Sequence, residues 1–338
     1  MAIKTQSTAM SKEVVNILRD TAVQLETKNL LLARSIMEMA KLGRPDGPFI
    51  TQRLDEYNEL LASTDALPSK NIQVVFSYPR SGSTFLLREL AGYSNISIAM
   101  EPFHQFENVR HKQIDTFLKS SSELSEFDRQ NFTHQLVTHA REDVSLYLKV
   151  IDSSISSENV AFKVFPGHLE KPQLSYLIKH TSKPILLYRN LLHSYISDVI
   201  ATESNRYANT DTSEIKISFN EKDFVTRSRK ILGFMNTVKR KLRLLDINFS
   251  TMHYEELAMV SSEKSSEKRD EYLSNKFAVK FEMPSNTHQS LKKQDSRGLA
   301  VEKVTNPEKM MACLHRMGLT DLNDNTTKMT ERYSRILS

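Results

Sequence analysis

The order of hydrophobic and polar positions divides the chain into a helical beginning and a longer part in which strands and helices alternate. Over residues 11–42 apolar side chains recur at the spacing of one long or two short helices, and Gly43 and Pro45 end the pattern. A further helical stretch covers residues 49–61. We interpret residues 1–68 as a helical N-terminal extension that serves packing or dimerisation, with direct contact to a substrate as the alternative.

From residue 69 to residue 338 short apolar runs alternate with helical patterns, which is typical of βαβ units around a parallel sheet. The predicted strands are 72–78, 96–100, 160–165, 184–188 and 248–253. The predicted helices are 83–93, 191–202, 224–245 and 307–316, the last one capped by Asn306. Polar strings predict mobile loops at 203–217 and 261–270. The pattern therefore indicates an α/β fold.

Composition narrows the functional classes. Of the 338 residues, 39% are hydrophobic and 26% charged, as in ordinary globular proteins. No run of eighteen apolar residues and no secretory signal occurs, and Cys313 alone cannot form an internal disulfide, so we expect a cytoplasmic protein without a membrane span. The net charge of +5 is spread along the chain without a zinc-ligand spacing or an RNA-binding signature. Nucleic acid and metal ions are therefore not expected as ligands.

The strongest motif is Tyr-Pro-Arg-Ser-Gly-Ser-Thr-Phe, residues 78–85, between a predicted strand and a predicted helix. Such a loop aims backbone N–H groups and the positive end of a helix at one point, which suits a phosphate. Gly82 allows close backbone approach, Arg80 supplies a cation, and Ser83 and Thr84 supply hydroxyl donors. A plain turn is the structural alternative. A P-loop kinase would need Gly-Lys-Ser/Thr, whereas Ser83 follows Gly82 here.

This motif resembles the 5′-phosphosulfate loop of the sulfotransferases that use 3′-phosphoadenosine-5′-phosphosulfate (PAPS). The family implies a three-layer parallel sheet with a P-loop-like strand-loop-helix and the cosubstrate at the carboxyl ends of the strands. By this resemblance, the residues that hold the 5′-phosphate and the sulfuryl group are Arg80, Ser81, Gly82, Ser83 and Thr84. Phe85 occupies the position where cytosolic members usually stack a tryptophan on the adenine. The resemblance covers residues 72–318.

A second phosphate site is indicated where Arg189 ends a predicted strand and Ser197 follows eight residues later on a helix. This spacing is similar to the family's 3′-phosphate site. A late basic loop, residues 291–299, is similar in character to the segment that closes over that phosphate, which implies Lys293, Arg297 and Gly298, with a solvated charged loop as the alternative. Residues 253–257, His-Tyr-Glu-Glu-Leu, resemble a further family string that we interpret as structural.

The catalytic groups follow from two strings. Lys163 resembles the family's strand lysine, but Phe165 occupies the position of the catalytic histidine of cytosolic members, and His168 lies nearby out of register. Glu101 begins a Glu-Pro-x-His string that resembles the carbohydrate-type members, and a carboxylate beside the acceptor can take its proton. A surface carboxylate is the alternative. The resemblance therefore implies Glu101 as base, Arg80 and Lys163 as stabilising cations, and His168 as a further candidate.

Together the motifs predict a sulfotransferase that moves a sulfuryl group from PAPS to a hydroxyl or an amine of a sugar or small polar metabolite and releases PAP. The acceptor and the choice between O- and N-sulfation stay open. The rivals are a P-loop nucleotide-dependent kinase and a noncatalytic nucleotide-binding protein. The expected partners are the acceptor and, through the helical extension, a second copy of the chain.

Overall fold

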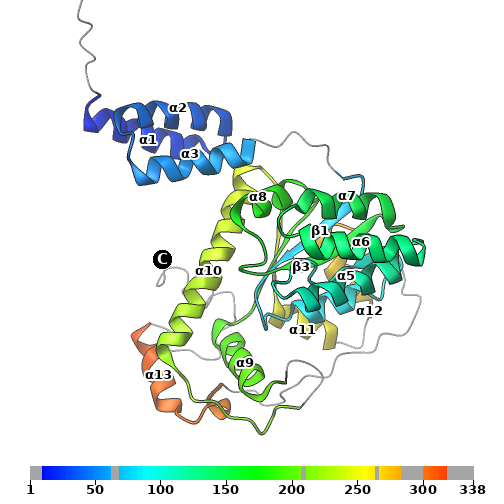
Figure 1. The fold of residues 1–338 in the computed structure, drawn as a ribbon. Helices are drawn as coiled ribbons and strands as arrows, with labels where there is room; N and C mark the ends of the chain where they lie inside the picture. Colours follow the sequence, from blue (N-terminus) through cyan, green and yellow to red (C-terminus); the bar gives the residue numbers. More distant parts are fainter. Residues whose placement is uncertain (1–9, 62–67, 207–210, 263–265, 283–299, 318–338) are drawn as a thin grey trace, which may run out of the picture.

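Five short strands form one sheet in which every neighbouring pair is parallel (Figure 1). In this computed structural model the described residues are 10–61, 68–206, 211–262, 266–282 and 300–317. The strands are β1 (Asn71–Phe76), β2 (Ile96–Ile98), β3 (Asn159–Val164), β4 (Ile185–Tyr188) and β5 (Ser250–His253). Their order in the sheet is β2-β3-β1-β4-β5. The predicted parallel α/β fold is confirmed.

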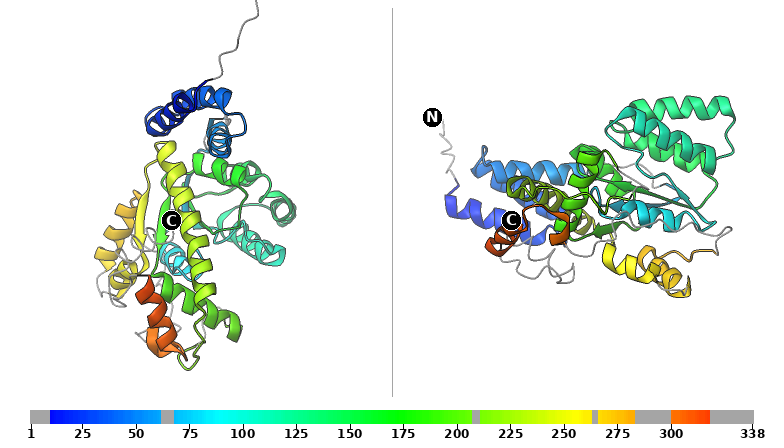
Figure 2. Two further views of the ribbon diagram at one scale, coloured as in Figure 1. Left: turned by 90° about the vertical axis from the view of Figure 1, so that its left-hand side faces the viewer. Right: turned by 90° about the horizontal axis from the view of Figure 1, so that it is seen from below.

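Helices cover both faces of the sheet and make it the middle of three layers (Figure 2). The helices that follow β1 in the described residues are α4 (Ser83–Leu90), α5 (Glu107–Ser121), α6 (Glu126–His139), α7 (Val144–Ser154), α8 (Lys171–Lys179), α9 (Leu191–Ser204), α10 (Glu221–Leu244), α11 (Tyr254–Ser262), α12 (Ser266–Phe277), the 3₁₀ turn η1 (Ala300–Lys303) and α13 (Pro307–Arg316). In β1 the side chains of Val74 and Phe76 pack with the α5–α10 layer, and Val75 packs with α4, α11 and α12. Burial on both faces explains why the strands are continuously apolar.

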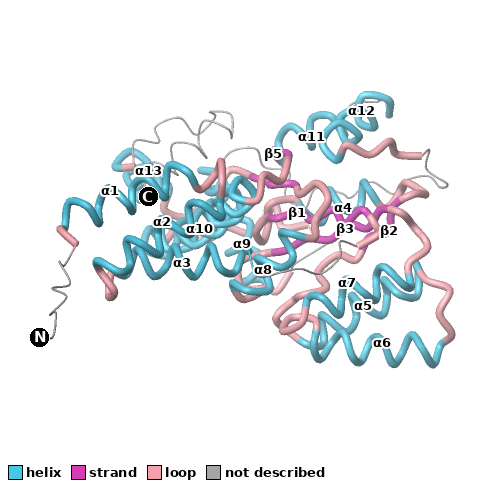
Figure 3. Tube along the Cα trace, turned by 90° about the horizontal axis from the view of Figure 1, so that it is seen from above, coloured by secondary structure: helices cyan, strands magenta, loops and turns pink. Residues whose placement is uncertain are grey.

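The connection from β2 to β3 is much longer than a single helix. It contains α5, α6 and α7, which lie on the face opposite α11 and α12 (Figure 3). The hydrophobic pattern did not predict these helices.

Two local predictions are wrong. Most of the loop predicted over residues 261–270 is helical, because Leu273 and Phe277 of α12 are buried against α4, while Glu267 and Lys268 are exposed. Asn306 precedes α13 but does not cap it: its side chain accepts from the Phe219 N–H at 2.7 Å and donates to the Phe219 carbonyl at 3.0 Å.

Residues 12–61 contain α1 (Lys12–Leu25), α2 (Leu30–Gly43) and α3 (Pro48–Leu61), which share a hydrophobic cluster of their own. Asn29 accepts the Leu32 N–H at 3.0 Å and begins α2, so two helices form instead of one. This helical unit packs on α8 through α3 and forms ion pairs with Arg240 of α10. Its separation as a domain at residue 68 stays a prediction. Every helix in the described ranges is too short or too polar to cross a bilayer.

Candidate active site

The loop between β1 and α4 is bent by two residues in the left-handed region, Arg80 at φ 63° and Gly82 at φ 89°. Gly82 is the N-cap of α4 and makes no side-chain cap bond, so the first N–H groups of the helix stay available to an anion. A Cβ at residue 82 would lie 2.1 Å from the Tyr254 ring. Ser81 and Ser83 are buried, whereas Thr84 is exposed. The local geometry fits the predicted anion loop.

The two predicted phosphate motifs lie side by side although they are about a hundred residues apart. Arg80 donates from Nε to Ser197 Oγ at 3.0 Å, and Arg189 donates from Nη1 to the Arg80 carbonyl at 2.7 Å. The Tyr78 hydroxyl accepts the Arg189 N–H at 2.7 Å and donates to the Arg189 carbonyl at 2.5 Å. Burial raises the pKa of Tyr78, which keeps it a neutral donor. Tyr78 thus couples the two motifs.

Tyr254, at the start of α11, contacts both loops. Its ring lies 4.5 Å below the Arg189 guanidinium carbon and 6.3 Å from the Phe85 ring in an edge-on arrangement. The next residue, Glu255, accepts the Asn190 N–H at 3.3 Å. The interpretation of this string as structural misses these contacts. The signal for them is its position directly after a strand, because all carboxyl ends of a parallel sheet lie at one edge.

The hydrogen bonding of Arg189 also indicates whether an anion fits between the two loops. Its Nε is buried and has no hydrogen-bond partner among the described residues. A buried donor without an acceptor is costly, and a bound phosphate oxygen would supply one. The arrangement of Arg80, Arg189, Ser197 and the α4 amides therefore suits a ligand with more than one anionic group.

A carboxylate and a lysine stand beside the anion loop. The Lys163 N–H donates to the Met100 carbonyl at 2.8 Å, which extends the β2–β3 pairing and places Glu101 next to the lysine. Lys163 Nζ lies 2.8 Å from Glu101 Oε1 and donates to Thr84 Oγ1 at 2.5 Å. Burial lowers the pKa of Lys163, and the Glu101 charge opposes that change. Lys163 therefore joins the anion loop to the carboxylate.

Two histidines approach the other oxygen of the same carboxylate. The Nε2 atoms of His104 and His168 lie 3.9 and 3.8 Å from Glu101 Oε2. Their Nδ1 atoms accept backbone N–H groups, from Phe106 at 3.1 Å and from Phe165 at 3.3 Å. Each neutral imidazole thus carries its proton on Nε2, toward Glu101. Burial lowers the pKa of His168 to about 4. His104 is the last residue of the Glu-Pro-x-His string and, like His168, is an alternative to Glu101 as base.

Four rings form a row from the surface to the lysine. Phe106, which is 60% exposed, lies 5.4 Å from His104, His104 lies 5.8 Å from His168, and His168 lies 5.1 Å from Phe165. Lys163 Nζ lies 5.2 Å from the Phe165 ring centre. Ring faces and edges of this kind can hold the apolar side of a flat ligand.

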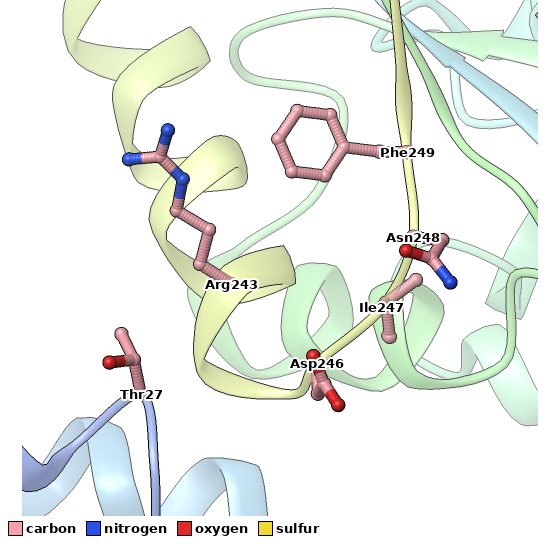
Figure 4. Close-up of a pocket in the computed structure, with 6 residues that line it drawn as sticks. All are labelled: Thr27, Arg243, Asp246, Ile247, Asn248 and Phe249. Carbon is pink, nitrogen blue, oxygen red and sulfur yellow. The ribbon is translucent and has the colours of Figure 1, made fainter.

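Lys293, Arg297 and Gly298 lie outside the described residues, so their role stays a prediction. A cavity of about 360 Å³ lies at the amino end of β5, between the α1–α2 turn and the end of α10 (Figure 4). Its lining residues are Thr27, Arg243, Asp246, Ile247, Asn248 and Phe249. It holds none of the candidate residues, and its two charged side chains are exposed. The chemistry lies at the opposite edge of the sheet.

Comparison with known proteins gives little beyond the fold. No family model and no curated protein matches the chain. Among solved structures, the chain is similar to the sulfotransferase domain from the Synechococcus PCC 7002 olefin synthase, with a TM-score of 0.41 and 15% identity over 80% of this chain and 95% of that domain. A likeness at this level does not decide the function, which has to come from the site itself.

Proposed function

We propose that the protein is a PAPS-dependent sulfotransferase that transfers a sulfuryl group to a hydroxyl or amine of a sugar or small polar metabolite. The observation that carries this proposal is the meeting of two anion-binding motifs with a lysine–carboxylate pair. Arg80 contacts Ser197, and Thr84 of the same loop contacts Lys163, which pairs with Glu101. PAPS carries a 3′-phosphate and a 5′-phosphosulfate, so it needs two anion sites beside one reacting centre.

The residues that would hold PAPS come from both loops. The 5′-phosphosulfate would lie on Arg80, Ser81, Gly82, Ser83 and Thr84, and the 3′-phosphate on Arg189 and Ser197. Phe85 and Tyr254, whose rings are in edge-on contact, would border the adenine. Lys293, Arg297 and Gly298 would complete the 3′-phosphate contact.

PAPS, when bound, supplies the sulfuryl group and a phosphate leaving group. Glu101 Oε2 is the oxygen placed to take the acceptor's proton, because Oε1 is bound by Lys163. The Nε2–H groups of His104 and His168 face Oε2 and can orient an acceptor oxygen there. Lys163 and Arg80 provide positive charge where negative charge develops during transfer. The row of rings ending at Phe106 supports an acceptor with one apolar face, such as a sugar.

Thermal-shift assays with PAP, ATP and GTP test the proposal against the kinase reading. PAP at a hundredfold excess over its dissociation constant should stabilise the protein by about 2.7 kcal/mol, and ATP and GTP should not. Transfer from radiolabelled PAPS to a panel of sugars and metabolites then separates an enzyme from a noncatalytic binder. Stabilisation by ATP or GTP without PAP would favour the kinase.

Arg189→Ala tests the 3′-phosphate site by calorimetric titration with PAP. It removes a charge-assisted contact, so the binding free energy should fall by roughly 1.5–3 kcal/mol in a folded protein. Arg243→Ala, which removes an exposed arginine at the far edge of the sheet, is the matched control and should bind PAP normally. Unchanged affinity in Arg189→Ala would remove the assignment.

A further inference from the structure

The β2–β3 connection carries an arginine whose hydrogen bonds go to backbone carbonyls. Arg110 of α5 is 7% exposed and donates from Nε to the Val137 carbonyl and from Nη1 to the His104 carbonyl, both at 2.7 Å. It forms no ion pair within the described residues. A guanidinium buried without a carboxylate is costly, so these two carbonyl contacts are what hold it in place.

A second arginine likewise binds backbone carbonyls, here in the segment that carries His168. Arg141, just after the end of α6, donates from Nε to the His168 carbonyl at 2.9 Å and from Nη2 to the Gly167 carbonyl at 3.0 Å. It too lacks an ion pair among the described residues. Because Val137 belongs to α6, both histidine segments are attached to the carboxyl end of that helix.

The attachment matters because each imidazole is bound to its own backbone. The Nδ1 atoms accept the N–H groups of Phe106 and Phe165, so the ring direction follows the path of the segment. The two segments leave different strands, yet both Nε2 atoms lie within 4 Å of the same Glu101 oxygen. A shift of either segment would break this convergence.

We propose that Arg110 and Arg141 are positioning residues that fix His104 and His168 against the acceptor side of Glu101. The placement of the two histidines rests on geometry alone. Their role in catalysis rests on the proposed function. It assigns the α5–α7 connection a role in the site, as the support for both histidine segments. A lysine cannot replace either arginine, because its single ammonium group cannot hold two carbonyls in a fixed fork.

Arg141→Lys is the deciding variant, since Arg141 is only partly buried and the protein should still fold. Arg110→Lys is the second variant, and Arg129→Lys is the matched control: Arg129 lies on α6, the helix that precedes Arg141, but pairs with the half-buried Asp115. NMR titration of the His168 ring, assigned with His168→Gln, reads the placement without any activity. The groups that face His168 are Glu101, His104, Lys163 and Arg141.

In the wild type the His168 ring should titrate near pH 4, because it is buried. In Arg141→Lys the segment loosens and admits water, so the pKa should rise by a unit or more toward 6.5, while Arg129→Lys stays unchanged. Acceptor kcat/KM should fall by roughly 10- to 100-fold in Arg141→Lys and Arg110→Lys, with PAP affinity within twofold of the wild type.

An unchanged His168 titration in folded Arg141→Lys overturns the positioning role. A shifted titration in a protein that, even as wild type, transfers no sulfuryl group supports the placement and contradicts the proposed function. If Arg110→Lys fails to fold, Arg141→Lys decides by itself. Equal losses of turnover in Arg129→Lys and Arg141→Lys would show a general loss of stability and overturn the proposal.

Discussion

Glu101 has two different environments on its two oxygens. Lys163 binds Oε1 at 2.8 Å, and Oε2 faces two imidazole N–H groups at nearly 4 Å, too far for hydrogen bonds. An acceptor hydroxyl can enter on the Oε2 side, accept hydrogen bonds from the two imidazole N–H groups and give its proton to Oε2. The carboxylate is thus oriented by its neighbours before any acceptor binds.

Glu101→Gln removes the base and keeps the shape. Because the amide cannot take a proton, turnover with a hydroxyl acceptor should fall by about 10²–10⁴, while PAP affinity is retained. Radiolabel transfer and calorimetry measure the two quantities. An active Glu101→Gln enzyme beside an inactive His168→Gln enzyme would transfer the role of base to the histidine.

His168 should make the protein sensitive to acid. Its pKa is about 4 in the folded chain and near 6.5 when unfolded, so the unfolded state binds more protons between these values. The stability that its neutral form contributes is present above pH 6.5 and is lost as the pH falls toward 4. Urea unfolding at pH 7 and pH 5 should show a loss of about 2 kcal/mol that is absent from His168→Gln. An equal loss in both proteins would assign the acid sensitivity to other groups.

At the scale of elements, the loop between β1 and α4 depends on a glycine for two reasons. Gly82 is left-handed at φ 89°, and the Tyr254 ring occupies the space of a side chain. The same ring lies against Arg189. A side chain at residue 82 would therefore displace a ring that contacts both anion motifs. The loop and α11 are therefore packed as one unit around the candidate phosphate sites.

Gly82→Ala should weaken PAP binding by at least tenfold, because the left-handed backbone costs about 1–2 kcal/mol and the Tyr254 ring must move. The matched control is Gly233→Ala in α10, where nothing lies within 4 Å of an added Cβ. There the substitution should stabilise the helix by up to about 1 kcal/mol and leave PAP binding intact. Calorimetry and urea unfolding give both values. Wild-type affinity in Gly82→Ala would contradict the packing argument.

At the scale of the whole molecule, charged groups join the N-terminal helical unit to α10. Arg240 lies 2.7 Å from Glu26 Oε2 and 3.2 Å from Glu56 Oε1, and the Tyr57 hydroxyl donates to Glu26 at 2.7 Å. Burial raises the pKa of Glu56, as expected for a carboxylate taken out of water. The contact between the helical unit and α10 is thus polar, and the two carboxylates depend on the positive charge of Arg240.

Arg240→Met leaves both carboxylates to Arg53, which lies 3.2 Å from Glu56 Oε2 and 3.9 Å from Glu26 Oε2. The free energy of unfolding should fall by about 1–3 kcal/mol, less than for a fully buried pair because Arg240 is one-quarter exposed. Arg34→Met, which breaks the exposed pair with Glu38, should cost less than about 1 kcal/mol. Urea unfolding compares them, with PAP affinity unchanged in both. An equal effect of the two substitutions would make the junction unimportant for stability.

The sequence by itself determined the parallel α/β fold and the strand-loop-helix that holds the candidate anion loop, because both depend on neighbours along the chain. Short continuous apolar runs indicate the buried strands, a period of 3.6 indicates the helices, and a Gly beside a helix start indicates an amide-lined turn. Arg189 and Ser197 are predicted from one strand-to-helix junction together with the family resemblance. The structure brings them beside Arg80, and their binding of a phosphate stays a prediction.

Only the tertiary structure decided the contacts between distant segments. Tyr254 reaches Gly82 and Arg189, both histidines reach one oxygen of Glu101, and none of these contacts has a periodic signature in the sequence. The polar surface of α12 hid its buried Leu273 and Phe277 in the same way. The physical reason is that the order of strands in the sheet and the path of the β2–β3 connection decide which strand ends lie next to each other. Side-chain packing then decides which residues at those ends are in contact.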